Sequence, residues 1–306
     1  MNTLTVLSPG LLTTVQDLGR EGYGAIGVSA SGAADMLSLR MGNKLLGNLE
    51  GAAGLEMTLL GGAFQFSGET WVAITGSDFG AALDGQAVLP YTVFKVSLGQ
   101  TLQFGPTKSG ARAYLCVRGG IDLPKTLGSR STHLLSGLGG LDGRALRKGD
   151  ILPIGDDSRC GTASYNSTTW HDLAIKRGAI RVTKGPQWEN FPSAARIKFL
   201  EQTYIVTEEA NRMGIRLKGA RHQLESAGEL ITEGVSLGAI QVPPSGQPII
   251  LFVEQQTTGG YPKLANVIAV DFPTVGQLRP RDEVRFELVS IEMARFLYLE
   301  RERALM

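Results

Sequence analysis

Short apolar runs separated by glycine-containing turns dominate the first third of this sequence and restrict the folds that it can adopt. Between residues 55 and 104 the runs are only a few residues long, and Gly61-Gly62, Gly68, Asp84-Gly85 and Gly99 separate them. Runs of this length, rich in β-branched and aromatic residues, are typical of strands. Asp84-Gly85 between two such runs is a strong signal for a tight β-hairpin. The pattern therefore predicts a mainly β fold with tight connections.

The composition and the length support the same fold class and favour two domains. Glycine makes up 40 of the 306 residues, well above the usual share of about 7%, and it is scattered rather than periodic. A chain of this length can form two medium-sized domains. The polar stretch 156–170 is nearly free of aliphatic residues, which favours a linker. We expect an N-terminal domain at residues 1–160 and a C-terminal domain at residues 171–306.

A few helices are expected beside the strands. Ser31 can cap a helix over residues 34–46, where leucine and methionine recur at a four-residue spacing. A short helix is predicted at 193–201, and an amphipathic one at 291–303 follows the last strand-like run. That run, residues 283–289, is expected to close a barrel or sheet.

Two polar, glycine-rich stretches are candidate binding loops. Residues 11–35 show little periodicity and are predicted to form a long functional loop. Residues 254–263 lie between two strand-like runs, 248–253 and 264–270, and combine glycine, hydroxyl, amide and charged groups. Such a loop can place backbone N–H groups and threonine hydroxyls against a small polar ligand. An ordinary Gly-Gly hairpin with polar side chains is the alternative.

Charge and cysteine content exclude several classes of function. The formal net charge is +1 and no long basic tract occurs, which argues against a nucleic-acid partner. Cys116 and Cys160 lie far apart in the sequence, so no disulfide framework is indicated and a reducing compartment is favoured. Neither a signal peptide nor an apolar run of about 18 residues is apparent. We expect a soluble, cytoplasmic protein that does not engage a membrane.

Several motifs that carry chemistry are missing. The sequence has no G-x-x-x-x-G-K-[ST] phosphate loop, no G-x-G-x-x-G that opens a helix after a strand, and no G-x-S-x-G elbow. Histidine and cysteine spacings typical of metal sites are absent, and so is a Met-Lys-Met biotin-attachment site. We therefore expect no metal and no cofactor bound by this chain alone, and any nucleotide chemistry to come from a partner.

Arginines and carboxylates on glycine-rich loops remain as candidate binding groups. An arginine fork suits a substrate carboxylate, and loop N–H groups can stabilise an oxyanion. For any one of them the alternative is an ordinary surface or inter-loop ion pair. The candidates are Asp17, Arg20, Asp35, Asp78, Arg118, Arg130, Arg212 and Arg216.

Six segments that cover nearly the whole chain match one known family, in the same order. The segments are 10–35, 74–85, 114–132, 137–150, 211–219 and 238–263. Through them the chain resembles the allophanate hydrolase subunit 2 family, a biotin-dependent carboxyltransferase-like family whose bacterial members include KipA and the C subunit of 5-oxoprolinase. The resemblance implies tandem cyclophilin-like β-barrel domains with a few short helices. Glu254 departs from the family pattern, where Asp is usual, and this bears on the substrate because an added methylene moves the carboxylate.

The resemblance also implies a function within a complex. The main function that the resemblance implies is that of the C subunit of an ATP-dependent 5-oxoprolinase. This subunit acts with a KipI-like subunit-1/B-type partner and an A-type component to convert 5-oxo-L-proline to L-glutamate. In this interpretation the complex, rather than this chain alone, uses ATP. One alternative is a carboxyltransferase that moves CO₂ from carboxybiotin, with biotin supplied in trans, to urea or a similar small amide. Another is a KipA-like regulator that binds a kinase inhibitor.

Candidate site residues follow from the 5-oxoprolinase interpretation. The predicted catalytic residues are Lys263, Tyr261 and Glu254, with the Lys263 ammonium near a developing oxyanion and Tyr261 as a wall of the pocket. The predicted substrate-binding residues are Arg118, Arg130, Arg212, Thr257, Thr258, Gly259, Gly260 and Asp35. The two glycines are expected because the loop backbone must approach a ligand closely or adopt a positive φ.

Overall fold

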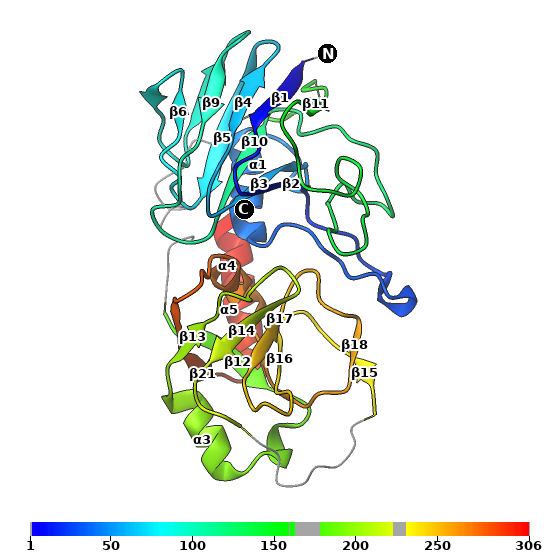
Figure 1. Ribbon diagram of the computed structural model, residues 1–306, viewed down its shortest axis with the longest axis vertical. Helices are drawn as coiled ribbons and strands as arrows, with labels where there is room; N and C mark the ends of the chain where they lie inside the picture. Colours follow the sequence, from blue (N-terminus) through cyan, green and yellow to red (C-terminus); the bar gives the residue numbers. More distant parts are fainter. Residues whose placement is uncertain (1, 159, 163–177, 223–230, 306) are drawn as a thin grey trace. The chain divides into compact units, whose positions relative to one another are not determined.

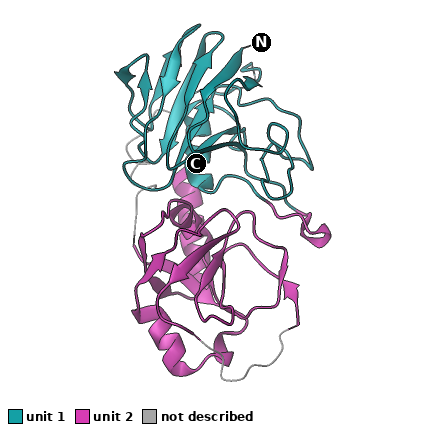
Figure 2. Ribbon diagram, viewed as in Figure 1, with its two compact units in different colours: residues 1–21, 31–175 teal, residues 22–30, 176–306 magenta. Residues whose placement is uncertain are grey.

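The computed structural model describes residues 2–158, 160–162, 178–222 and 231–305. The chain divides into two compact units, one of residues 1–21 and 31–175 and the other of residues 22–30 and 176–306 (Figure 2). Both consist mainly of β-strands with a few short helices (Figure 1), which confirms the predicted fold class. The predicted linker at 156–170 lies largely outside the described residues.

The described residues of the first unit form two antiparallel sheets and one helix. Its elements are β1 (Thr3–Ser8), β2 (Leu12–Gln16), α1 (Met36–Leu45), β3 (Gly54–Thr58), β4 (Ala63–Phe66), β5 (Thr70–Gly76), β6 (Ala82–Leu83), β7 (Gln86–Ala87), β8 (Val93–Val96), β9 (Thr101–Gln103), β10 (Arg112–Val117) and β11 (Ile151–Pro153). The strand orders are β11-β1-β4-β9-β6-β7 and β2-β3-β10-β5-β8. Side chains from both sheets, such as Leu4, Phe64, Leu55 and Leu115, form one buried core.

The first helix begins at a different cap from the one that the sequence indicated. Asp35 is the N-cap of α1, because its carboxylate accepts hydrogen bonds from the backbone N–H of Ser38 at 3.0 Å and from the Ser38 hydroxyl at 2.6 Å. The expected cap, Ser31, has a φ of 55° and donates its hydroxyl to the carbonyl of Thr132. The helix was therefore predicted correctly, but its cap was wrong.

Close packing of α1 on the sheet depends on a glycine. The helix contacts β5 and β10, and a Cβ at Gly42 would lie 2.6 Å from Sγ of Cys116 and 3.0 Å from Oγ1 of Thr75. Any larger residue would push the helix away from the sheet, since interiors are packed without spare volume.

Two other predictions for the first unit had opposite outcomes. β6 and β7 form the expected hairpin, in which Asp84 and Gly85 have φ values of 46° and 84°, as a type I′ turn requires. The predicted loop at 11–35, in contrast, begins with a strand, β2. The sequence of β2 lacks the alternation of apolar and polar residues typical of a strand, because its polar residues are also buried, with hydrogen-bond partners. Gln16, for example, donates its side-chain amide to the carbonyl of Thr132.

The second unit is built around one eight-stranded sheet that forms a nearly closed barrel. Its elements are η1 (Gly24–Ile26), β12 (Ile180–Lys184), η2 (Trp188–Asn190), α3 (Ser193–Glu201), β13 (Tyr204–Val206), β14 (Gly214–Lys218), β15 (Glu233–Gly234), β16 (Ala239–Gln241), β17 (Ile249–Leu251), β18 (Thr258–Gly259), β19 (Lys263–Val267), η3 (Ala269–Asp271), α4 (Phe272–Gly276), β20 (Glu283–Val284), β21 (Phe286–Leu288) and α5 (Ile291–Leu305). The sheet order is β20-β13-β14-β17-β16-β19-β12-β21, and β15 pairs with β18 apart from it.

A single residue connects the two edge strands of this sheet. Arg285 separates β20, which pairs with β13 at one edge, from β21, which pairs in parallel with β12 at the other. The two edges must therefore lie within one residue of each other, so the sheet closes on itself. This confirms that the run at 283–289 closes the barrel. The predicted run at 264–270, however, is a strand only as far as Val267.

The second unit contains a buried aromatic cluster that includes a histidine. Phe199 of α3 stacks on Phe286 with ring centroids 4.6 Å apart, and it makes an edge contact with His222. Nε2 of His222 lies 2.6 Å from the hydroxyl of Tyr204. Burial lowers the pKa of His222 from the usual value of 6.5 to about 4.

The buried histidine predicts a pH dependence of stability. Between pH 6.5 and about 4 the unfolded chain binds a proton at His222 that the folded chain does not bind, so the unfolding free energy should fall as the pH drops through this window. His222→Gln, which cannot titrate, should flatten this dependence. Urea unfolding at a series of pH values measures it. An unchanged slope in the variant, at the same m-value, would contradict the assignment.

Candidate functional site

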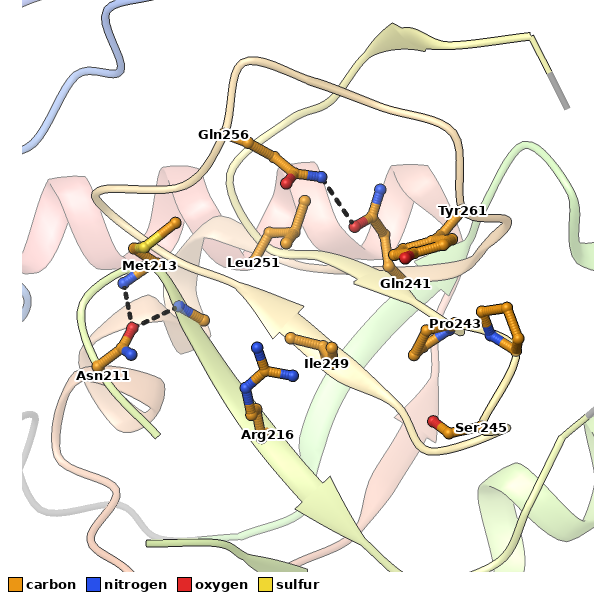
Figure 3. Close-up of a pocket in the computed structure, with 12 residues that line it drawn as sticks. Asn211, Met213, Arg216, Gln241, Pro243, Ser245, Ile249, Leu251, Gln256 and Tyr261 are labelled. Atoms are coloured by element: carbon orange, nitrogen blue, oxygen red, sulfur yellow. Dashed lines mark hydrogen bonds between the residues drawn. The ribbon is translucent and has the colours of Figure 1, made fainter. Parts of the chain in front are cut away.

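A pocket of about 440 Å³ lies on the barrel of the second unit (Figure 3). This volume is typical of sites for small molecules. Its walls come from β14, β16 and β17, the turn before β14 and the loops after β16 and β17. The lining residues are Asn211, Met213, Gly214, Arg216, Gln241, Pro243, Pro244, Ser245, Ile249, Leu251, Gln256 and Tyr261.

Strand register places the pocket floor. Arg216 of β14 pairs with Ile249 of β17, and Ile249 pairs with Gln241 of β16. The three residues therefore form one row across neighbouring strands, and with strands about 4.8 Å apart the backbones of the two outer residues lie about 10 Å apart. Their sequence neighbours Ile215 and Ile250 are fully buried, because alternate side chains point to opposite faces. The pocket thus lies on the face opposite the barrel core.

Two of the segments that carry the family resemblance, 211–219 and 238–263, meet at this pocket. Asn211 begins the first segment, and its side-chain oxygen accepts a hydrogen bond from the backbone N–H of Met213 at 2.8 Å (Figure 3). Gln241 and Pro243 come from the second segment, and so does Tyr261, in the polar loop at its end. Among the predicted catalytic residues, Tyr261 is the one that lines the pocket.

The polar loop at 254–263 is not part of a hairpin. β17 and β19, which flank it, are not neighbours, because β16 lies between them in the sheet. The loop instead crosses from one side of β16 to the other, and its residues Thr258–Gly259 pair with Glu233–Gly234. The hairpin alternative is therefore wrong.

Close approach, rather than a positive φ, explains one of the two predicted glycines. A Cβ at Gly259 would lie 2.6 Å from Nε2 of both Gln241 and Gln256. The backbone at Gly259 therefore rests directly against two side-chain amides at the pocket. Gly260 and Thr258 are exposed beside it, and the carbonyl of Thr257 accepts a hydrogen bond from the backbone of Val235.

Lys263 lies in β19 outside the pocket lining. Its ammonium is buried and forms an ion pair with Glu233, whose side chain is half-exposed. The side chain of Gln187 bridges the pair, accepting from the Lys263 backbone at 2.9 Å and donating to Glu233 at 3.0 Å. The hydrogen bond from Lys263 holds the pKa of Glu233 below its usual range. The pair ties β15 to β19 beneath the polar loop.

The structure brings two predicted site residues, Glu254 and Arg212, into direct contact. Both are buried, Nε of Arg212 lies 2.5 Å from Oε1 of Glu254, and the Glu254 N–H donates to the Arg212 carbonyl at 2.9 Å. A buried carboxylate needs such a partner, because the loss of hydration is costly otherwise. The pair anchors the start of the polar loop to the turn before β14.

The other predicted site residues belong to the first unit and have local partners there. Arg118 donates to the carbonyl of Leu46, which follows α1, whereas Asp35 caps the opposite end of that helix. Arg130 donates to the carbonyl of Leu123 at 2.7 Å and to Asp122 at 2.5 Å. These side chains therefore do not gather at one place.

Sequence reasoning overlooked most of the pocket. Arg216 was one of eight charged candidates without a distinguishing feature, and Gln241 and Gln256 were not singled out. Their signal was available in principle, since all three lie in segments that match the family, and Arg216 alternates with the apolar residues Ile215 and Leu217 along a strand. The sequence does not show, however, which strands are neighbours in the sheet.

The described residues show neither a metal-binding cluster nor a membrane-spanning helix. No group of three or more His, Cys, Asp and Glu side chains there is arranged to hold a metal ion. Likewise, none of the helices in the described part of the chain has both the length and the apolar character needed to span a membrane.

Comparison with known proteins relates this geometry to a family. A family model for the carboxyltransferase domain, subdomains A and B, matches residues 26–288. The chain is 38% identical to the C subunit of 5-oxoprolinase from Escherichia coli (strain K12), over 95% of this chain and 93% of that protein. It is also 38% identical to the same-named protein of Haemophilus influenzae, over 92% of this chain and 89% of that one.

A solved structure shares the whole fold. The crystal structure of K. lactis urea amidolyase superposes with a TM-score of 0.92 at 30% identity, over 99% of this chain. This chain corresponds to only 20% of that much longer protein. The same fold therefore also occurs as one part of a longer protein.

The contact between Arg212 and Glu254 predicts a large and specific stability effect. Glu254→Gln leaves the Arg212 charge buried without its carboxylate, so the unfolding free energy should fall by about 3–5 kcal/mol. Glu208→Gln, which removes the exposed partner of Arg281, should cost less than about 1 kcal/mol. Chemical denaturation of both variants measures the difference. Equal losses of unfolding free energy would show that the buried pair stabilises the fold no more than an exposed one.

Proposed function

The chain belongs to the family of carboxyltransferase domains with subdomains A and B, and from this membership we propose that it is the C subunit of an ATP-dependent 5-oxoprolinase. The complex converts 5-oxo-L-proline to L-glutamate by opening the lactam ring. One observation carries the proposal: the two relatives named as C subunits of 5-oxoprolinase match this chain over nearly their full length as well as its own. The likeness thus extends along most of each of those relatives.

The chemistry explains why such a protein works within a complex. Opening an unstrained amide in water is unfavourable, and coupling to ATP supplies the driving force. In the proposed scheme the γ-phosphoryl group moves from ATP to the lactam oxygen and ADP leaves. Water then adds to the activated carbon and the C–N bond breaks, which leaves the amine and an acyl phosphate. A second water hydrolyses the acyl phosphate to the carboxylate and inorganic phosphate. The sequence of this chain has no phosphate-binding loop, so we assign ATP binding to the partners.

The proposed partners are a subunit-1/B-type protein and an A-type component. This chain would contribute the pocket in the second unit, and it would bind no cofactor alone. A cytoplasmic location belongs to the same proposal, which the free thiols of Cys116 and Cys160 support.

A second function is favoured by the structural match to K. lactis urea amidolyase. In this alternative the chain is a carboxyltransferase that moves CO₂ from carboxybiotin, carried by another protein, to urea or a similar amide. Both substrates are small amides, so the fold alone separates the two functions poorly.

Reconstitution tests the proposal directly. The chain is purified together with the products of its neighbouring genes, and glutamate release from 5-oxo-L-proline is measured with and without ATP. We expect release that requires both ATP and this chain. Calorimetry on the chain alone should detect no ATP binding in the micromolar range. Carboxylation of urea with a biotinylated carrier, in place of glutamate release, would support the alternative.

Lys263 tests whether the polar loop takes part in the reaction. Lys263→Met removes the ammonium, and loss of one such electrostatic contact to a developing oxyanion should lower turnover about 10²–10³-fold. Glu233→Gln is the matched control, because it breaks the same ion pair but keeps the ammonium. Its turnover should remain within about tenfold of wild type. Equal losses in the two variants would mean that Lys263 acts only by joining β15 to β19.

A further inference from the structure

We infer that the pocket of the second unit recognises a carboxylate and an amide on one small ligand, with Arg216 as the carboxylate anchor and the carboxamides of Gln241 and Gln256 as the amide-binding groups. The inference rests on the proposed function and names the residues that would give it specificity. It selects a lactam that carries an acid group over urea, which has no carboxylate.

The guanidinium of Arg216 is available for a ligand. Its side chain is 52% exposed, and within the described residues the guanidinium forms one ion pair, from Nε to Glu209 at 3.5 Å. Glu209 is itself 78% exposed, so the pair is weak and easily replaced. The two terminal nitrogens can then bind a carboxylate in the bidentate geometry that arginine favours.

The predicted carboxylate-binding arginines differ from Arg216 in this respect. Arg118 and Arg130 use their guanidinium groups on backbone carbonyls of the first unit, and Arg212 is paired with buried Glu254. Among these four arginines, Arg216 is also the one that lines the pocket. The position of its guanidinium therefore favours it as the anchor.

Gln241 and Gln256 supply the complementary amide groups. Nε2 of Gln256 approaches Oε1 of Gln241 at 3.5 Å, the outer limit of a hydrogen bond (Figure 3). Nε2 of Gln241 is buried without any hydrogen-bond partner among the described residues, although buried polar groups are normally paired. Rotation of the two carboxamides can replace this weak contact by a donor and an acceptor aimed at a ligand amide.

The spacing of these groups fits one small ligand. Arg216 and Gln241 lie at the two ends of a row whose middle residue is Ile249, so their backbones are about 10 Å apart. Figure 3 shows the guanidinium on one side of the pocket and the two carboxamides on the other, with Ile249 and Leu251 between them. A lactam ring can rest on these apolar side chains with its polar groups directed to the two ends.

Binding measurements on the full-length chain test the inference. Calorimetry compares 5-oxo-L-proline with 2-pyrrolidinone, which lacks the carboxylate, with L-proline, which lacks the lactam carbonyl, and with urea. We expect 5-oxo-L-proline to bind most tightly. Arg216→Met should raise its Kd about 10- to 100-fold and leave that of 2-pyrrolidinone unchanged. Gln241→Met should weaken 5-oxo-L-proline more than L-proline.

A matched control excludes a general loss of charge or stability. Arg281→Met also removes an exposed arginine from an ion pair, with Glu208, but Arg281 does not line the pocket. Its Kd for 5-oxo-L-proline and its melting temperature should equal those of wild type. In the reconstituted complex, Arg216→Met should raise KM while kcat changes little, which a merely structural role would not produce.

The outcomes separate the inference from the proposed function. If the complex releases glutamate but Arg216→Met leaves Kd and KM within about threefold of wild type, the inference is wrong and the function stands. If the complex does not open 5-oxo-L-proline, the proposed function is wrong. The binding measurements on the chain alone then test whether the pocket recognises a carboxylate and an amide. Tighter binding of 5-oxo-L-proline than of 2-pyrrolidinone, lost in Arg216→Met, would support the inference. Equal binding of the two, or binding of neither, contradicts it.

Discussion

The register between β14, β17 and β16 is the constraint on which the second unit depends. It fixes which side chains enter the barrel core and which form the pocket floor, because alternate residues of a strand point to opposite faces. With Arg216 opposite Ile249 and Ile249 opposite Gln241, an arginine and an amide share one surface with an apolar residue between them. A slip by one residue would bury the charge and expose Ile250, so the same interaction that stabilises the core also builds the site.

Local features of the sequence predicted local structure well. The Asp84-Gly85 turn, the helix at Ser193–Glu201 and the closing run at 283–289 needed only turn chemistry and periodicity, and the structure has all three. β2 was missed because its polar residues are buried with partners that the sequence does not reveal; Gln16, for example, donates to the carbonyl of Thr132, 116 residues away. The cap of α1 was wrong because Ser31 and Asp35 carry similar capping groups, and only the backbone conformation selects between them.

The candidate site was less predictable than the fold, for a physical reason. An arginine in a sequence shows its charge but not its partner, and the partner decides whether the charge can meet a ligand. Arg212 and Arg216 are four residues apart, yet one is buried against Glu254 and the other is half-exposed at the pocket. Burial and strand neighbours separate them, and both are properties of the tertiary structure. The family resemblance named the right segments without distinguishing these two side chains.

The single-residue link between β20 and β21 has a consequence for the order in which the protein can be made. β12 is among the first strands of the second unit to leave the ribosome, but its parallel neighbour β21 is the last strand of the sheet. The first unit has no such delay, since its latest described strand, β11, ends at Pro153. Translation must therefore pass residue 288 before the barrel can close, whereas the strands of the first unit are complete after about half the chain has been synthesised.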